Sequence, residues 1–483
     1  MSGANAMFRR TRRVHFVGIG GIGMCGIAEL LHAEGVAVRG SDLQEGPTVA
    51  RLRSLGIEVA IGHDAAHVGD ADVLVYSSAV RASNPELVEA KRRGIPAIRR
   101  AEMLAELMRM KQGIAIAGTH GKTTTTSLVA HVLSAAGLDP TAIVGGRVRG
   151  ASFGATTRRG AGAWLVAEAD ESDGSFLRLA PVVAVVTNVE PEHLDHWGDE
   201  RALRDAFADF ANRVPFWGAA IVCLDDPGVR ALLPRLERRV TTYGTDPRAH
   251  WVASDVRADG YGVRFRVARA GAPQGEAFAP LVGAHNALNA LAAIAVADEL
   301  EVPFAKAAEA LTGFGGVERR FEIKGAARGI TVVDDYGHHP TEVRATLAAA
   351  RGVHAGRIVT VFQPHRYSRT RDLFDDFARA FDDADVLVLT AVYGAGEDRP
   401  DDPRASAAEL ARAVRARGHA DVRYVEDRAA VAAQLAPALR EGDLVITLGA
   451  GNVSAIGPEL LALLGPPDGA RDGAAAPAPG GRR

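Results

Sequence analysis

The chain has 483 residues, of which 47% are hydrophobic, and its formal net charge is −3. At ~150 residues per domain, this length predicts two to four domains with ample apolar material for their cores. No basic excess points to nucleic acid, and no apolar run reaches the ~18 uncharged residues of a membrane span. The two cysteines, Cys25 and Cys223, are far apart in sequence, which argues against a disulfide framework and favours the cytoplasm.

Four arginines precede the apolar stretch 14–31, an arrangement that also occurs in signal peptides. That stretch carries His15, Glu29 and several glycines, and no small-residue cleavage site follows it. We therefore interpret it as a strand, a turn and a helix. Residues 1–13 are expected to form a mobile leader. Residues 465–483, rich in Pro, Gly and Ala, are expected to form a disordered tail.

Glycines separate the first predicted strand from the helix after it. The turn has the pattern G-x-G-G-x-G and comprises Gly18, Gly20, Gly21 and Gly23. Asp42 follows at the ~20-residue spacing of a dinucleotide-binding fingerprint. Such a turn can hold a dinucleotide or the diphosphate of another nucleotide, or it can serve packing alone. Further strands are expected at 36–39, 73–77 and 95–98, and the first domain at 14–111.

Residues 113–126 carry the most informative motif. An apolar strand is followed by a short loop, then by Lys122 and a row of threonines that opens an apolar-periodic helix. Backbone N–H groups and the helix dipole suit a phosphate, a lysine suits the terminal phosphates and a threonine hydroxyl suits Mg²⁺. Ile116 stands where the strict phosphate-loop pattern has its first glycine, so this loop is a shortened one. The motif comprises Gly118, Thr119, His120, Gly121, Lys122, Thr123 and Thr124.

The segment 112–317 is predicted to form a second α/β domain. Its strands are expected at 164–168, 182–188, 219–224 and 240–243, and alternation over 250–267 indicates a small antiparallel portion. An acidic run, which begins at Glu168 and includes Asp170 and Glu171, follows the first of these strands. It is interpreted either as a Mg²⁺ site beside ATP phosphates or as a solvated loop.

A cluster of carboxylates and imidazoles follows the strand at 182–188. It includes Glu190, Glu192, His193, Asp195 and His196. These side chains suit a second divalent metal site or a general base. Zinc is the weaker candidate because no cysteine joins the cluster.

Two polar pairs lie near the end of the second domain. Asn286 and Asn289 are one helical turn apart, where paired amides either read an adenine edge or cap the helix. Arg319 and Arg320 stand at the junction with the third domain, where an arginine can stabilise phosphate charge or form an interdomain salt bridge.

The third domain, 318–464, is expected to have strands at 331–335, 357–362, 386–389, 422–424 and 444–448. Asp335 and His338 follow the first strand, and His365, Arg366 and Arg369 follow the second. The arginines suit recognition of a carboxylate or phosphate better than single-stranded nucleic acid, which would require more aromatic side chains. All of these polar motifs lie at carboxyl ends of strands, where open α/β sheets bind ligands.

Together these motifs, in this order over residues 14–464, resemble the Mur ligase family. The resemblance implies an α/β fold of three domains: an N-terminal Rossmann-like domain for a UDP-sugar, a central P-loop ATPase with a small antiparallel portion, and a C-terminal Rossmann-like domain. It also implies ATP and Mg²⁺ as cofactors. The particular set of strings is similar to the member that joins L-alanine to UDP-N-acetylmuramate, with no obligate protein partner evident.

The resemblance also assigns roles. Lys122 would hold the β- and γ-phosphates of ATP, Thr123 and Glu168 would bind one Mg²⁺ and His193 a second. Asn286, Asn289, Arg320 and Asp335 would complete the ATP site. Contacts with alanine and the acyl phosphate would come from His338, His365, Arg366 and Arg369. The UDP-sugar would lie on Gly18, Gly20, Gly21, Gly23, Asp42, Ser78 and His120.

Three alternatives remain at this stage. A related ligase attaches a recycled tripeptide to the same sugar, although the string from His365 to Thr370 favours the alanine enzyme. An NAD-dependent oxidoreductase is favoured only by the glycine turn and Asp42. A non-catalytic nucleotide switch is favoured only by the phosphate loop and leaves the motifs at Asp335 and His365 unexplained.

Overall fold

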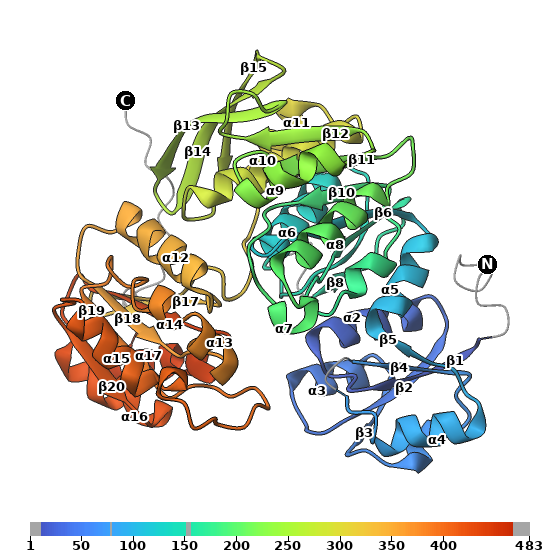
Figure 1. Ribbon diagram of the computed structural model, residues 1–483, viewed down its shortest axis with the longest axis horizontal. Coiled ribbons are helices and arrows are strands. Elements are labelled where there is room, and N and C mark those ends of the chain that lie inside the picture. Colours follow the sequence, from blue (N-terminus) through green and yellow to red (C-terminus); the bar gives the residue numbers. More distant parts are fainter. Residues whose placement is uncertain (1–10, 78–79, 151–155, 467–483) are drawn as a thin grey trace. The chain divides into compact units, whose positions relative to one another are not determined.

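The computed structural model describes residues 11–77, 80–150 and 156–466 (Figure 1). The predicted UDP-sugar residue Ser78 and most of the expected leader and tail lie outside these residues. The described chain divides into two compact units. The first comprises the described residues within 11–257, 264–280 and 286–317, and the second comprises 258–263, 281–285 and 318–466.

A five-stranded parallel sheet opens the first unit, in the order β3-β2-β1-β4-β5 (blue in Figure 1). Because β1 and β4 are neighbours at the centre, the chain leaves β1 in one direction and returns in the other, which creates a topological switch point above their carboxyl ends. The elements are β1 Arg13–Val17, α2 Ile22–Ala33, β2 Ala37–Asp42, α3 Pro47–Ser54, β3 Glu58–Ile61, η1 Ala65–Val68, β4 Val73–Tyr76, α4 Pro85–Arg93, β5 Ala97–Arg99 and α5 Arg100–Arg109.

The start of β1 differs from the expected leader. Arg13 already belongs to the strand, and the backbone N–H groups of Arg12 and Arg13 donate to Asp72 at 2.8 and 2.9 Å. The last residues assigned to the leader are therefore fixed to the sheet, because the carboxylate of Asp72, after η1, accepts hydrogen bonds from both of their N–H groups.

The second sheet has ten strands in the order β15-β14-β13-β12-β11-β10-β6-β9-β7-β8. Its central strands β10, β6 and β9 are parallel neighbours and almost wholly apolar, as expected for strands covered on both faces. The strands are β6 Gln112–Ala117, β7 Thr141–Ile143, β8 Thr157–Arg158, β9 Trp164–Glu168, β10 Val183–Val186, β11 Ala219–Cys223, β12 Val240–Gly244, β13 Trp251–Asp259, β14 Gly262–Arg269 and β15 Ala272–Ala279.

The antiparallel portion lies at one edge of this sheet. Two-residue connections join β13 to β14 and β14 to β15, and such hairpins require antiparallel neighbours. The helical segments associated with the sheet are α6 Lys122–Ala135, η2 Ser175–Arg178, α7 Leu194–Trp197, α8 Glu200–Asn212, α9 Pro227–Leu232, η3 Leu233–Arg235, α10 His285–Glu299 and α11 Phe304–Thr312.

The second unit contains a six-stranded sheet in the order β16-β17-β21-β18-β19-β20, parallel except for β16 (orange and red in Figure 1). Adjacent residues such as Val332 and Val333 belong to two different apolar clusters, so both faces are covered. The strands are β16 Glu322–Ala327, β17 Ile330–Asp335, β18 Ile358–Phe362, β19 Val386–Thr390, β20 Val422–Val425 and β21 Leu444–Leu448.

The helical segments of the second unit are α12 Pro340–Val353, α13 Tyr367–Asp372, α14 Phe374–Phe377, η4 Pro403–Ala405, α15 Ala407–Ala416, α16 Arg428–Leu435, η5 Ala436–Ala438, η6 Asn452–Ala455 and α17 Ile456–Leu464. Across the described parts of both units, no helix combines the length and apolar character needed to cross a membrane. The α/β architecture with three largely parallel sheets agrees with the predicted fold class.

Candidate active site

The phosphate loop lies where β6 turns into α6. Gly118 has φ +138° and Gly121 has φ +81°, conformations that glycine adopts readily. Polar groups after the neighbouring strand β10 hold the loop: Asn188 Oδ1 accepts from the His120 N–H at 2.7 Å, and Thr187 Oγ1 donates to the His120 carbonyl at 2.6 Å. The N-terminus of α6 is therefore presented to a ligand by a loop fixed from the next strand.

Lys122, the first residue of α6, is half-buried and packs against acidic side chains. Its Nζ donates to the carbonyls of Gly118 (2.6 Å) and Thr119 (3.1 Å) and to Glu171 Oε1 (3.0 Å). Burial alone would lower the pKa of Lys122, but Glu171, Asp170 and Glu168 outweigh it and raise that pKa. Lys122 thus stays cationic.

Thr123 and Glu168, which the resemblance assigns to one Mg²⁺, lie next to each other at one edge of the second sheet. Thr123 Oγ1 donates to Glu168 Oε2 at 2.9 Å, and the Gly145 N–H donates to the same oxygen at 2.9 Å. The contact follows from topology because β6 and β9 are parallel neighbours, so the end of β9 at Glu168 and the loop after β6 lie at the same edge. A hydroxyl and a carboxylate are hard oxygen ligands of the kind that Mg²⁺ prefers, so these residues fit the ion. Thr124, next in the row, is buried.

A second group of metal-type ligands lies nearby on the same unit. His193 is grouped with Glu171 and Glu192, with one ligand atom of each lying within 4.8 Å of the others. His193 has φ +56° at the start of α7, and the Trp197 indole N–H donates to the Glu171 carbonyl at 3.2 Å. Burial raises the pKa of Glu171 to about 7, against the opposing effect of Lys122.

The sequence places Glu192 and His193 together in the cluster suited to a second metal, whereas it places Glu171 in the acidic run after the strand 164–168. Both carboxylates lie in sequence motifs that are rich in acidic residues. Which carboxylate of each motif faces His193 depended on the turns that follow β9 and β10. The side chain of Asp195 lies outside what the structure describes.

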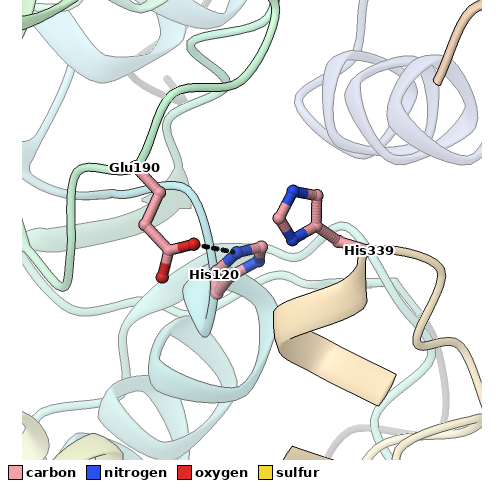
Figure 2. Close-up of side chains that lie close together, drawn as sticks. All are labelled: His120, Glu190 and His339. Carbon is pink, nitrogen blue, oxygen red and sulfur yellow. Dashed lines mark ion pairs between the residues drawn. The ribbon is translucent and has the colours of Figure 1, made fainter. Parts of the chain in front are cut away.

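His120 and Glu190 form an ion pair with 3.5 Å between Nε2 and Oε2 (Figure 2). The Glu190 N–H also donates to Thr119 Oγ1 at 2.9 Å. His120 was predicted to contact both ATP and the UDP-sugar, and the structure places it in the phosphate loop. His339, also labelled in Figure 2, belongs to the second unit and caps the N-terminus of α12.

The predicted asparagine pair connects α10 with α6. Asn289 Nδ2 donates to Asn286 Oδ1 at 2.9 Å, and Thr125 Oγ1 donates to Asn289 Oδ1 at 3.2 Å. A methyl group on Gly121 would lie only 2.8 Å from Asn289 Oδ1. The amides are therefore packed against the phosphate loop.

The two arginines after the second domain differ in their surroundings. Arg319 is tied into the sheet of the second unit: its Nε donates to Asp334 at 3.0 Å and its Nη2 to the Gly449 carbonyl at 2.5 Å. Arg320 lies over the Tyr336 ring at 5.3 Å and is 3.9 Å from Glu342. Arg319 therefore has a structural role, which leaves Arg320 as the candidate for phosphate charge.

Asp335, at the end of β17, organises the loop around it. It accepts the N–H groups of Phe321 and Gly337, each at 2.7 Å, and the Thr346 hydroxyl at 3.3 Å. Burial raises the pKa of Asp335, an effect that Arg320 opposes.

The candidate alanine residues gather at the ends of β17 and β18. The rings of His338 and His365 are 5.8 Å apart, and Tyr393 stacks on His365 at 5.6 Å. Arg369 Nη1 lies 3.5 Å from His365 Nδ1, and the exposed Arg366 has φ +68°. Burial and the charges of His338, Arg369 and Arg366 lower the pKa of His365 to about 3, so its ring is neutral at pH 7.

A pocket of about 890 Å³ lies at the switch point of the first sheet. It brings together four predicted UDP-sugar residues: Gly18, Gly20, Gly21 and Asp42. Asp42 Oδ2 accepts the Gly20 N–H at 2.8 Å, so this carboxylate shapes the glycine turn. Gly23 is instead inside α2, where a methyl group would come within 3.0 Å of the Arg100 guanidinium.

Models of one family match the three parts of the chain. Residues 13–112 match the catalytic domain of the Mur ligase family, 116–297 the Mur ligase middle domain and 319–451 the glutamate ligase domain of Mur ligases. Together these matches span most of the described chain.

Individual relatives agree with the models. A UDP-N-acetylmuramate–L-alanine ligase of Anaeromyxobacter sp. (strain Fw109-5) is 57% identical over 95% of this chain and 99% of its own length. The ligase of the same name from Myxococcus xanthus is 56% identical over 94% and 96%.

Solved structures give the same result. The crystal structure of a UDP-N-acetylmuramate-alanine ligase from Thermotoga maritima has a TM-score of 0.80 and 30% identity over 93% of this chain and 98% of that one. A murein peptide ligase from Psychrobacter arcticus has a TM-score of 0.71 and 25% identity over 94% and 98%. The chain belongs to the Mur ligase family.

Proposed function

We propose that this chain joins L-alanine to UDP-N-acetylmuramate with consumption of ATP, a step in peptidoglycan precursor synthesis. The observation that carries the proposal is the 57% identity, over nearly the full length of both chains, to a UDP-N-acetylmuramate–L-alanine ligase. The first unit supplies a phosphate loop with a cationic lysine, and its N-terminal sheet supplies a glycine-turn pocket of nucleotide size. Both features fit the substrates.

The reaction requires activation of a carboxylate. An oxygen of the lactyl carboxylate attacks the γ-phosphorus of ATP, ADP leaves and an acyl phosphate forms. The amine of L-alanine then attacks the acyl carbon, and the tetrahedral intermediate expels phosphate as the amine loses a proton. Because charge moves onto phosphate oxygens in both steps, the protein acts mainly by positioning and charge stabilisation.

Roles for individual residues follow from this chemistry. In this proposal Lys122 stabilises the β- and γ-phosphates, Thr123 and Glu168 bind one Mg²⁺, and His193 with Glu171 and Glu192 binds a second. Asn286 and Asn289 contact the adenine, while Arg320 and Asp335 act on the nucleotide. His338, His365, Arg366 and Arg369 bind alanine or the acyl phosphate. Gly18, Gly20, Gly21 and Asp42 bind the UDP-sugar.

Phosphate release from ATP tests the assignment. The rate should require UDP-N-acetylmuramate and an amino acid together, and L-alanine should support it far better than the tripeptide used by murein peptide ligases. A preference for the tripeptide would assign the chain to that activity instead. NADH binding without UDP-sugar-dependent phosphate release would favour an oxidoreductase and overturn the ligase assignment.

A further inference from the structure

A buried carboxylate lies beneath the pocket of the first sheet. Glu86, in the first turn of α4, is fully buried and accepts the Ser41 hydroxyl at 2.7 Å. His15 Nε2 lies 2.5 Å from one carboxylate oxygen, and His63 Nδ1 lies 2.7 Å from the other. Side chains from β1, from β2 and from the segment after β3 thus contact one carboxylate, Glu86, which has no part in the proposed phosphate-transfer steps.

The charge of Glu86 fixes the proton on His63. Burial would raise the pKa of Glu86, but hydrogen bonds from His15, Ser41 and His63 hold it below its usual value. An ionised carboxylate can only accept, so His63 Nδ1 carries a hydrogen and donates it. In a neutral imidazole the other nitrogen, Nε2, is then a hydrogen-bond acceptor.

His63 also lines the pocket that contains the glycine turn and Asp42. Its Nδ1 is engaged by Glu86 and lies 3.1 Å from the Ser41 hydroxyl, whereas its Nε2 has no hydrogen-bond partner among the residues that the structure describes. The pocket therefore contains a hydrogen-bond acceptor, His63 Nε2, and Glu86 sets the tautomer of this ring by binding its Nδ1.

The order of the strands indicates which part of a ligand meets this acceptor. The glycine turn follows β1, Asp42 ends β2 and His63 follows β3, and these strands are consecutive neighbours in the sheet. A diphosphate at the glycine turn and the N-terminus of α2 directs its nucleoside across β2 toward β3. His63 is thus at the nucleoside end.

We propose that His63 Nε2 accepts a hydrogen bond from the uracil N3–H of the sugar nucleotide, and that Glu86 is the positioning residue that fixes the accepting tautomer. Cytosine has a lone pair instead of N–H at N3, so the same ring would reject it. The inference rests on the proposed use of a uridine diphosphate sugar and adds a determinant of base specificity to it.

Binding of nucleoside diphosphates to the full chain tests this inference without catalysis. UDP, 2′-deoxy-UDP and CDP are titrated calorimetrically against wild type, His63→Phe and His63→Gln. Wild type should bind UDP about tenfold more tightly than CDP, because an unsatisfied buried acceptor costs ~1–3 kcal/mol and ~1.4 kcal/mol is a factor of ten. Phe should remove this preference by weakening UDP binding, and Gln, whose amide oxygen can accept, should restore part of it.

Two further variants separate specificity from packing. His67 Nδ1 also lies 4.0 Å from Glu86, but His67 does not line the pocket, so His67→Phe should keep the wild-type ratio of UDP to CDP affinity. Glu86→Gln presents an amide that can donate to His63 Nδ1 and thereby place the hydrogen on Nε2. It should shift the ratio toward CDP, an effect that mere loss of packing would not produce.

Equal weakening of UDP and CDP by His63→Phe would overturn the inference, as would equal affinity of wild type for both. A loss confined to 2′-deoxy-UDP would assign the contact to the ribose and overturn it as well. Failure of L-alanine-dependent phosphate release would instead contradict the proposed function, because these titrations contain neither ATP nor alanine. If Glu86→Gln does not fold, the His63 variants still decide.

Discussion

At the scale of single residues, Lys122 has the most specific surroundings. It is held by two loop carbonyls and by Glu171, so its ammonium is fixed where α6 begins. Replacing it with Met keeps the stem but removes the charge that would stabilise the transferring phosphate. Lys122→Met should lower ATP-dependent phosphate release at least about a hundredfold.

A matched control for this change is Lys306→Met. Lys306 Nζ also donates to a backbone carbonyl, that of Ala136 at 2.8 Å, but the residue is exposed on α11. Its replacement should leave the rate within about twofold of wild type, as for surface substitutions generally. Near-normal turnover by Lys122→Met would contradict the assignment of the loop to ATP.

Arg319 and Arg320 provide a second comparison at this scale. Removing Arg319 leaves Asp334 buried without its cation, so Arg319→Ala should lower the free energy of unfolding by about 3 kcal/mol. Arg320→Ala should change stability by less than about 0.5 kcal/mol yet reduce turnover at least about tenfold.

Urea unfolding of the purified variants and a phosphate-release assay at saturating substrates measure both quantities. The two changes should separate completely, with stability lost in one variant and rate in the other. A stable Arg319→Ala protein, or an Arg320→Ala protein with wild-type turnover, would contradict the division of labour between these neighbours.

At the scale of elements, the turn between β6 and α6 allows only glycine at position 118. At φ +138° a side chain is strained, and a methyl group would lie 1.9 Å from Thr187 Oγ1. Gly118→Ala should therefore cost more than about 3 kcal/mol and abolish nucleotide binding, because both the strain and the clash must be relieved.

Gly137, just beyond the other end of α6, is the matched control. It has φ +85°, but no atom lies within 4 Å of the position of an added methyl group. Gly137→Ala should cost about 1–2 kcal/mol from backbone strain alone. Thermal unfolding and titration with ADP measure both effects. Equal losses in the two variants would show that strain alone, without the contact to Thr187, determines the turn.

The strands predicted most clearly from sequence are those whose burial is nearly uniform. β6, β9, β10, β18 and β21 are apolar runs bounded by turns, and the sequence reveals them for that reason. The strands β3, β5, β7, β8 and β16 were not predicted as such or were displaced. They are short or polar, and their pairing depends on neighbours distant in sequence. β16, for instance, is fixed as a strand by antiparallel bonds to β17.

Contacts in the candidate site likewise differ in how far the sequence predicts them. The proximity of Thr123 to Glu168 could be anticipated because both lie at the carboxyl ends of strands in a parallel sheet. The pairing of Lys122 with Glu171 could not, since it depends on how the turn after β9 directs one carboxylate among several. The contact of Glu86 with His63 also left no local signal, because neither residue belongs to a motif and only the fold brings them together.

At the scale of the whole molecule, the chain consists of two compact units with different spectroscopic probes. All four tryptophans, Trp164, Trp197, Trp217 and Trp251, belong to the first unit, as do both cysteines. Tryptophan fluorescence therefore reports the unit that contains the phosphate loop, whereas far-UV circular dichroism reports helices of both units. A chain of this kind need not unfold in one cooperative step.

We expect the two signals to give different urea midpoints and ADP with Mg²⁺ to raise the fluorescence midpoint. A ligand at a hundred times its dissociation constant stabilises the state that binds it by ~2.7 kcal/mol. The free energy of unfolding obtained from the fluorescence transition should therefore rise by that amount. The dichroism transition should then split or broaden, because most of the proposed nucleotide contacts, including Lys122, Thr123 and Asn289, belong to the first unit. Coincident transitions that move together would instead show that the chain unfolds as one cooperative body. A fluorescence transition that ADP leaves in place, while phosphate release stays normal, would separate the tryptophans from the nucleotide site.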